Sequence, residues 1–313
     1  MDSLYAITSI FNPCNYKTRY KLYKEFEKRC KDSGIILYTI EAAFKDQDFA
    51  VTDKNNNRHI QVRTNDELWI KENLLNIVLD KLPTDANYIA WIDADIIFTH
   101  PDIVAATITA LQKYSIVQMF SHAVDLDVNH TCLITNGIIK EPQQSACYRF
   151  IRTNGFVGLE TKEDFNNSIG HTGYAWAATR EALNATNGFL DFAILGSADK
   201  YMFHGWIDKI FASKKPVFSK EYNLKMEEWT TKALTLNKNI GYVDGLLLHY
   251  FHGAKKNRGY QDRWRILEKH QFDPIKDLGI TKDGVITFVG NKPELEKDVR
   301  EYFQSRKEDS TES

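Results

Sequence analysis

The sequence is poor in cysteine, with four in 313 residues and no two of them spaced as a Cys-x-x-Cys pair. The absence of such a pair excludes the usual zinc-binding motifs, and four cysteines are too few for a densely disulfide-bonded small domain. Widely separated cysteines are typical of proteins that keep their thiols reduced. These residues are Cys14, Cys30, Cys132 and Cys147.

A long hydrophobic run is also absent. No stretch approaches the roughly 20 apolar residues that a membrane-spanning helix needs, and the first residues lack the basic and apolar segments of a secretory signal. We therefore expect a cytoplasmic protein. The net charge is only −2, which gives no global indication of a nucleic-acid or membrane partner.

Glycine-rich phosphate loops are missing too. Residues 4–40 have the pattern of an apolar strand, a helix and a second strand, so a βαβ unit opens the chain. Ligands of such sheets bind beyond the carboxyl ends of the strands. We therefore expect a nucleotide near Thr8, Ile10 and Asn12, although the absence of Gly-x-Gly-x-x-Gly excludes a Rossmann dinucleotide site.

The sequence does contain an acidic pair after an apolar strand. Residues 88–92 (Tyr-Ile-Ala-Trp-Ile) have the right length for a strand buried on both faces, and Asp93 and Asp95 follow directly. Residues two apart in a strand point to the same side, and Mg²⁺ and Mn²⁺ prefer carboxylates together with phosphate oxygens. The pattern predicts a divalent metal site, the alternative being an acidic junction without a metal.

With this acidic pair, the chain resembles the GT-A family of nucleotide-sugar-dependent glycosyltransferases, whose Asp-x-Asp motif holds the metal that binds the donor diphosphate. The resemblance covers most of residues 4–265. It implies an α/β fold of the Rossmann-like GT-A type, with a mostly parallel central sheet flanked by helices. It also implies Mn²⁺ or Mg²⁺ bound by Asp95, with Asp93 as a second ligand that orients the donor. The donor would be a nucleoside-diphosphate sugar such as a UDP-sugar.

Many eukaryotic glycosyltransferases of the Golgi carry a membrane anchor, and this sequence has no apolar run of the necessary length. The resemblance therefore implies a cytoplasmic enzyme of bacterial or viral origin, in the host cytoplasm if viral, or a shortened form of an anchored enzyme.

Two further segments match the family around the donor and the acceptor. Lys71 stands where GT-A enzymes carry a basic residue toward the donor diphosphate, and a solvated surface lysine is the alternative. Residues 170–180 match the glycine-rich acceptor side. The resemblance implies that Gly173, Tyr174 and Trp176 bind the acceptor, with a place in the core as the alternative for Trp176.

Residues 188–201 resemble the Gly-x-x-Asp/Glu-Asp region beside the reacting centre, where inverting members use a carboxylate as general base. A single acid, Asp199, stands here where some families have a doublet, so the stereochemical outcome stays open. The alternative role of Asp199 is that of a helix N-cap or first-turn acid.

Residues 245–253 form an apolar strand that ends in His-Gly, and GT-A enzymes close the metal site with a histidine from such a strand. His249 and His252 are three apart and would face opposite sides of a strand. We therefore expect His252 to bind the metal and His249 to be structural. The basic segment that follows implies that Lys255 and Arg258 neutralise diphosphate charge. A solvated loop or a nucleic-acid patch is the alternative.

The predicted organisation is a glycosyltransferase domain over residues 1–265. Its first half, residues 1–120, would bind the nucleotide, and its second half, residues 121–265, would bind the acceptor and close the metal site. Residues 266–304 would form an extension packed on this domain. Residues 305–313 are polar, and we expect them to be a disordered tail.

The predicted function is sugar transfer from the donor to a hydroxyl group of a glycan or another biomolecule, and a nucleic-acid acceptor is not favoured. A nucleotidyltransferase is the alternative. Such enzymes usually need a glycine-rich basic loop after the first strand, and residues 11–15 (Phe-Asn-Pro-Cys-Asn) contain neither glycine nor lysine. A non-catalytic sugar- or nucleotide-binding protein on the same fold is the third possibility.

Overall fold

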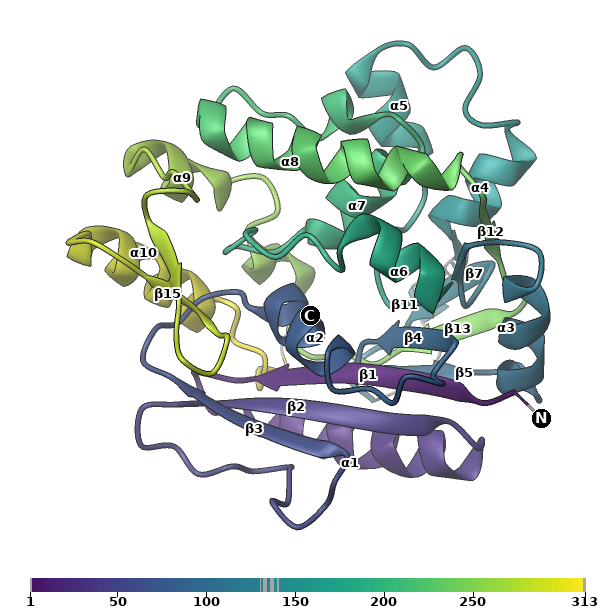
Figure 1. The fold of residues 1–313 in the computed structure, drawn as a ribbon, viewed down its shortest axis with the longest axis horizontal. Helices are drawn as coiled ribbons and strands as arrows, with labels where there is room; N and C mark the ends of the chain where they lie inside the picture. Colours follow the sequence, from purple (N-terminus) through teal and green to yellow (C-terminus); the bar gives the residue numbers. More distant parts are fainter. Residues whose placement is uncertain (1, 130, 132–133, 136–137, 140, 312–313) are drawn as a thin grey trace.

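The protein is an α/β structure built on a seven-stranded central sheet flanked by helices (Figure 1). The computed structural model describes residues 2–129, 131, 134–135, 138–139 and 141–311. The sheet comprises β1 (Leu4–Phe11), β2 (Ile36–Phe44), β3 (His59–Thr64), β4 (Tyr88–Ile92), β6 (Ile116–Gln118), β11 (Ala175–Thr179) and β12 (Ile240–Tyr242). Its order is β12-β6-β11-β4-β1-β2-β3, and only β11 runs antiparallel to its neighbours. The predicted mostly parallel α/β class is confirmed.

Ten α-helices surround the sheets in the described part of the chain. They are α1 (Lys17–Asp32), α2 (Lys71–Leu79), α3 (Ile103–Leu111), α4 (Ala146–Arg152), α5 (Lys162–Ser168), α6 (Arg180–Thr186), α7 (Ala198–Trp206), α8 (Lys220–Ala233), α9 (Trp264–Lys269) and α10 (Pro293–Ser305). Three 3-10 turns are η1 (Ile210–Ala212), η2 (Leu234–Leu236) and η3 (Lys255–Arg258). Two small hairpins pair β8 (Ile134–Thr135) with β9 (Ile138–Ile139) and β14 (Leu278–Ile280) with β15 (Ile286–Phe288).

The central sheet is buried on both faces because alternate side chains of its middle strands pack against helices on opposite sides. In β1, Ile7 belongs to a core formed with α2, α6, α7 and α8, whereas Ala6 and Ile10 belong to a core formed with α1 and α3. The strand ends of β1 and β4 therefore open between two packed layers. This is the edge at which the sequence predicted the ligand.

A second, four-stranded sheet brings distant residues to that edge. It comprises β5 (Ile96–Phe98), β7 (His122–Asp125), β10 (Gln143–Gln144) and β13 (Leu246–His249), in the order β10-β7-β13-β5. Its register pairs His249 with Ile96 on one side and with Asp125 on the other. Because Asp95 directly precedes β5, this register alone places one imidazole between two carboxylates.

Trp176 lies in an aromatic core and not on the acceptor side, so its predicted acceptor role is wrong. It is 2% exposed and stands opposite Trp91 in the β11–β4 register, with the two rings stacked at 6.2 Å between centroids. Trp206 packs on both rings. The indole nitrogen of Trp176 donates to the Thr172 carbonyl at 2.9 Å, so its polar atom is satisfied inside the core.

The polar tail is ordered through residue 311, in contrast to the predicted disorder. Arg306 and Glu308 are 4% and 2% exposed, because both side chains turn inward and pair with one another, and Glu308 also pairs with Arg19. Residues 312 and 313 lie outside the described part of the chain.

Two simpler expectations concern membranes and thiols. Within the described residues, the helices are all too short or too polar to cross a bilayer. Cys14, Cys30 and Cys147 are free thiols. Cys132 lies outside the described residues.

Trp176→Ala should destabilise the fold by about 3–5 kcal/mol, because removing a buried indole leaves a cavity between Trp91 and Trp206. The free energy of unfolding in a denaturant titration measures this loss. Leu224→Ala is the matched control, since Leu224 is 41% exposed on α8 and its truncation should stay within about 0.5 kcal/mol. A Trp176 variant as stable as the control would contradict the core assignment.

Candidate metal centre and active site

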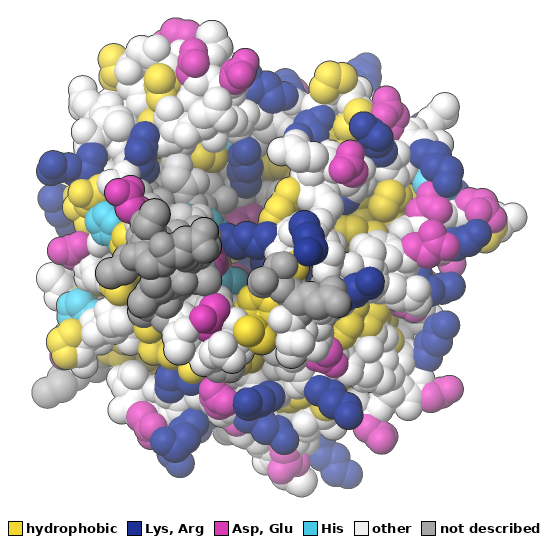
Figure 2. Space-filling model, turned by 180° about the vertical axis from the view of Figure 1, so that it is seen from behind, with side chains coloured by type: hydrophobic (Ala, Val, Ile, Leu, Met, Phe, Trp, Pro, Cys, Tyr) yellow, Lys and Arg dark blue, Asp and Glu magenta, His cyan; other side chains and the backbone are white. Residues whose placement is uncertain are grey.

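A cavity of about 480 Å³ opens at the carboxyl ends of β1 and β4. Its walls come from β1, the start of α2, the turn after β4, the segment before β11, the start of α7 and the loop after β13. The face drawn in Figure 2 has a hollow near its middle, in which basic, acidic and histidine side chains lie close together. Of the described residues that line the cavity, seven are Lys or Arg and four are Asp or Glu, so positive charge is in excess.

The acidic motif sits in a tight turn between β4 and β5. The Asp93 amide donates to the Tyr174 carbonyl at 2.8 Å, and the Tyr250 amide donates to the Asp95 carbonyl at 2.8 Å. These bonds fasten the turn to the segment before β11 and to the loop after β13. Because the strand ends at Ile92, the rule that residues two apart share one side of a strand does not hold for Asp93 and Asp95.

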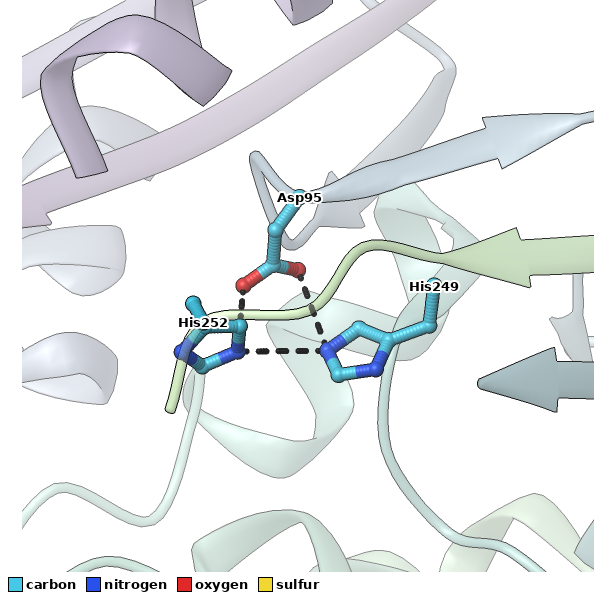
Figure 3. Close-up of side chains that lie close together, drawn as sticks. All are labelled: Asp95, His249 and His252. Atoms are coloured by element: carbon cyan, nitrogen blue, oxygen red, sulfur yellow. Dashed lines mark hydrogen bonds and ion pairs between the residues drawn. The ribbon is translucent and has the colours of Figure 1, made fainter. Parts of the chain in front are cut away.

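Asp95, His249 and His252 converge on one point (Figure 3). His252 Nε2 lies 3.1 Å from Asp95 Oδ2 and 3.2 Å from His249 Nε2. His249 Nε2 lies 3.7 Å from Asp95 Oδ1. His249 was predicted to be structural. That prediction is wrong, because the ring of His249 points toward Asp95 and His252. The strand ends at His249, so the chain turns before His252 and both rings reach Asp95.

The far nitrogen of His249 fixes its tautomer. His249 Nδ1 is 2.9 Å from Asp125 Oδ1, and the carboxylate can only accept, so the proton belongs on Nδ1. Nε2 then presents a lone pair toward Asp95 and His252. Asp125 is itself held by Tyr174 Oη at 2.9 Å and by Lys255 Nζ at 2.5 Å. A carboxylate behind a converging histidine is the usual support of a metal ligand.

The side chains fit a divalent cation. Asp95 Oδ1 is buried and has no hydrogen-bond partner, which is costly unless a cation or water satisfies it. Burial acts to raise the pKa of Asp95, but His252 and His249 outweigh it and hold that pKa well below its usual range. Burial lowers the pKa of His249 despite the nearby carboxylates. The cluster is therefore one anionic oxygen ligand beside a neutral imidazole, the forms that metals bind.

Asp93 lies outside this cluster, and its carboxylate forms an ion pair with Lys71. Lys71 is thus not the solvated surface lysine of the alternative interpretation. Burial acts to lower the pKa of Lys71, but the charges of Asp93, Glu72 and Asp199 outweigh it and raise that pKa. A cation therefore stands in the cavity, paired with the first carboxylate of the acidic motif.

Glu72 is a buried carboxyl that the sequence did not reveal as part of the site. It lines the cavity and is 5% exposed. Burial raises its pKa from 4.5 to about 8, and the negative charge of Asp199 adds to this rise while Lys71 opposes it. Its position directly after a cavity lysine was visible in the sequence, but its burial depends on the packing of α2.

Asp199 and Gly173 form the wall opposite the cluster. Asp199 lies in the first turn of α7, as its alternative interpretation proposed, but its side chain faces the cavity, with Oδ2 3.5 Å from Thr172 Oγ1. A Cβ atom on Gly173 would lie 3.0 Å from Asp199 Oδ2 and 3.0 Å from His171 Cε1. Tyr174 also lines the cavity, and its ring stacks on His171. These residues are brought together as predicted.

Thr8, Ile10 and Asn12 are the residues that were predicted to lie near the nucleotide. Thr8 and Ile10 line the cavity, but the Thr8 hydroxyl donates to the Ile92 carbonyl at 2.8 Å and ties β1 to β4. Asn12 is buried, and its side chain closes a turn with the Tyr16 backbone at 2.9 and 3.0 Å. The prediction that Asn12 faces a nucleotide is wrong, because both ends of its amide serve this turn.

Lys255 and Arg258 both line the cavity, as predicted for the basic segment. Lys255 pairs with Asp125, and Arg258 Nη2 lies 3.1 Å from His252 Nε2. Both cations therefore contact the supports or the ligands of the cluster. The residues that the sequence missed are His249 as a converging ligand, Asp125 and Glu308 behind the imidazoles, and Glu72.

No family model matches this sequence, and no curated protein matches it. Among solved structures, the chain is similar to the catalytic domain of Drosophila β1,4-galactosyltransferase 7 in complex with xylobiose (9% identity, 94% of this chain, 98% of the other, TM-score 0.38). It is similar to glucosyl-3-phosphoglycerate synthase from Mycobacterium tuberculosis in complex with Mn²⁺, UDP and phosphoglyceric acid (12%, 93%, 88%, 0.39). It is also similar to 4-diphosphocytidyl-2C-methyl-D-erythritol synthase from Anaerococcus prevotii (11%, 78%, 89%, 0.31).

Glu72→Gln should change how stability depends on pH. Because the pKa of Glu72 is raised from 4.5 to about 8, the folded protein keeps a proton there that the unfolded chain releases. Wild-type stability therefore falls as pH rises through this window, and the amide removes that loss. Denaturant unfolding between about pH 5 and pH 9 should show the variant gaining stability relative to wild type as pH rises.

The matched control is Glu228→Gln, since Glu228 is exposed on α8. Its stability difference from wild type should stay constant with pH. A difference for Glu72→Gln that is equally flat would contradict the buried, proton-holding carboxyl.

Proposed function

We propose that this protein is a metal-dependent glycosyltransferase that uses a nucleoside-diphosphate sugar, specifically a UDP-sugar, and transfers the sugar to a hydroxyl group of a glycan or another biomolecule. One observation carries the proposal. Asp95, His249 and His252 converge beside a cavity rich in basic side chains, at the end of a buried parallel strand. A divalent ion and an anionic diphosphate are the chemistry that such a site suits.

The donor set favours Mn²⁺ over Mg²⁺. Mg²⁺ keeps to oxygen ligands and several waters, whereas two imidazole nitrogens beside one carboxylate suit a transition metal. Asp95, His249 and His252 would hold the ion. When bound, Mn²⁺ supplies positive charge to the phosphate oxygens of the leaving group.

The residues around the cluster bind and orient the donor. Lys71 keeps its charge through Asp93, Glu72 and Asp199, and it lies where a diphosphate beside Asp95 would accept its N–H groups. Arg258 lines the same cavity, with Nη2 3.1 Å from His252 Nε2. Fixed cations of this kind stabilise the negative charge that the departing diphosphate develops.

The acceptor would enter along Gly173, Tyr174 and Asp199. The missing side chain of Gly173 leaves Asp199 Oδ2 uncovered on the cavity side. In an inverting reaction, Asp199 Oδ2 takes the proton of the acceptor hydroxyl. The hydroxyl oxygen of the acceptor attacks the anomeric carbon of the sugar, and the nucleoside diphosphate leaves. Thr172 Oγ1, 3.5 Å from Asp199 Oδ2, helps to keep the carboxylate in place.

The product released by the protein separates this function from its alternatives. A panel of nucleotide-sugars with Mn²⁺ and simple glycan acceptors should give a nucleoside diphosphate and a glycosylated acceptor. A nucleotidyltransferase would instead release pyrophosphate from a nucleoside triphosphate. A binding protein would be stabilised by the nucleotide-sugar and release nothing.

Asp95→Asn should abolish Mn²⁺ binding and leave the fold intact, because it removes the charged oxygen ligand but keeps the side-chain shape. Wild type at 100 times the Mn²⁺ dissociation constant should gain about 2.7 kcal/mol of stability. Calorimetric titration and thermal unfolding with Mn²⁺ measure both effects. The control Asp85→Asn, at an exposed turn residue, should bind as wild type does. Unchanged Mn²⁺ affinity in Asp95→Asn would refute the metal assignment.

Asp199→Asn should leave the affinity for UDP-sugar and Mn²⁺ near normal and lower kcat by about 10²–10⁴-fold, because a general base acts only in the transition state. Steady-state kinetics of the variant measure kcat, and a donor-binding titration of the same variant measures the affinity for the UDP-sugar. Weakened donor binding with an unchanged kcat would instead place Asp199 in donor recognition.

A further inference from the structure

A second carboxylate stands behind the cluster, on the far side of His252. Glu308 follows α10, and its Oε2 lies 3.6 Å from His252 Nδ1. This separation is longer than a hydrogen bond but close enough for the charge to favour a proton on Nδ1. His249 has the same arrangement, with Asp125 at its outer nitrogen. Each converging imidazole is therefore backed by an acid from a different part of the chain.

Two arginines fix the Glu308 carboxylate in its buried position. Arg19 pairs through Nε with Oε2 and through Nη2 with Oε1 at 2.8 Å. Arg306 Nε donates to Oε1 at 2.6 Å. With both oxygens occupied by guanidinium donors, the carboxylate cannot swing away from the imidazole.

The segment that carries Glu308 is fastened to the start of α1. Asp309 accepts hydrogen bonds from the amides of Lys17 and Thr18 at 2.9 and 2.8 Å, at the N-terminus of that helix. The Tyr16 hydroxyl donates to the Phe303 carbonyl at 3.0 Å. Residues 306–309 therefore have a fixed path beside His252, one of the three side chains that could bind a metal.

Gly253 shows how closely this segment approaches the loop of His252. A Cβ atom on Gly253 would lie 3.0 Å from Glu308 Cα and 3.0 Å from the Lys307 carbonyl oxygen. The glycine also has a φ of +86°, which favours a residue without a side chain. The backbone next to His252 thus packs directly on the backbone next to Glu308.

The inner nitrogen of His252 lies between a donor and an acceptor. His252 Nε2 lies 3.1 Å from Arg258 Nη2, which only donates, and 3.1 Å from Asp95 Oδ2, which only accepts. A divalent ion held by Asp95, His249 and His252 would need the lone pair of this nitrogen. The proton of His252 would then have to lie on Nδ1, toward Glu308.

We propose that Glu308 is a positioning residue for the metal site: it favours the Nδ1–H tautomer of His252 that a bound cation requires, and the segment 306–309 is thereby part of the metal site. This inference rests on the proposed function only in taking Mn²⁺ as the ion. Glu308 touches neither donor nor acceptor in this role. It acts through the orientation and protonation of one ligand.

The test compares Glu308→Gln with wild type in two measurements. Glu308→Gln should weaken Mn²⁺ binding by about 10- to 100-fold in calorimetric titration, as expected for the support of a metal-binding histidine. In ¹⁵N-histidine-labelled protein without metal, the ring nitrogen shifts of His252 should show a smaller fraction of the Nδ1–H tautomer in Glu308→Gln than in wild type. Glu301→Gln, an exposed change on α10, is the matched control for charge and should alter neither result.

A second variant covers the case in which Glu308→Gln fails to fold. Glu308→Asp keeps the charge between Arg19 and Arg306 but withdraws the oxygens from His252 by one methylene group. It should fold and still bind Mn²⁺ more weakly than wild type. Wild-type Mn²⁺ affinity in a folded Glu308 variant, with an unchanged His252 tautomer, overturns the proposal. Absence of Mn²⁺ binding in wild type itself would instead overturn the proposed metal site.

Discussion

Two imidazole nitrogens face each other at 3.2 Å with a carboxylate beside them, and the rest of the structure serves to hold this arrangement. The His249 proton is directed outward to Asp125, so the lone pair on the inner nitrogen of His249 faces the point where a divalent cation would lie. Such an arrangement persists in a low-dielectric interior only when the surrounding framework imposes it. The four-stranded sheet provides that framework, because its register sets His249 between Ile96 and Asp125.

Three cations that line the cavity are already paired with carboxylates. Lys71 lies on Asp93, Lys255 on Asp125 and Arg306 on Glu308. A pre-paired site needs little rearrangement when charge develops during a reaction, which is the basis of electrostatic preorganisation. The existing ion pairs also favour strongly anionic ligands, because a ligand must attract these cations more strongly than their partner carboxylates do. A diphosphate bound to a divalent ion meets that requirement.

Much of the fold was predictable because its signals are local. The run 88–92 is apolar enough to be a central strand, and the βαβ unit at the start follows from periodicity. The predictions that were wrong concern residues beyond the ends of regular strands or residues whose partners are distant in sequence. Strand alternation did not apply to His249 and His252, because the strand stops between them. Asp125 and Glu308 carry no local signal, since each acquires its role from a partner more than 50 residues away.

The clasp between residues 16–19 and 306–309 links the two ends of the described chain. In sequence, 289 positions separate Arg19 from Glu308. A chain leaving the ribosome can form its central sheet first, since domains fold from the N-terminus during synthesis. His252 acquires its acidic support only after residue 308 has emerged. A nascent chain that ends between residues 252 and 308 therefore holds His252 without the carboxylate of Glu308 behind it.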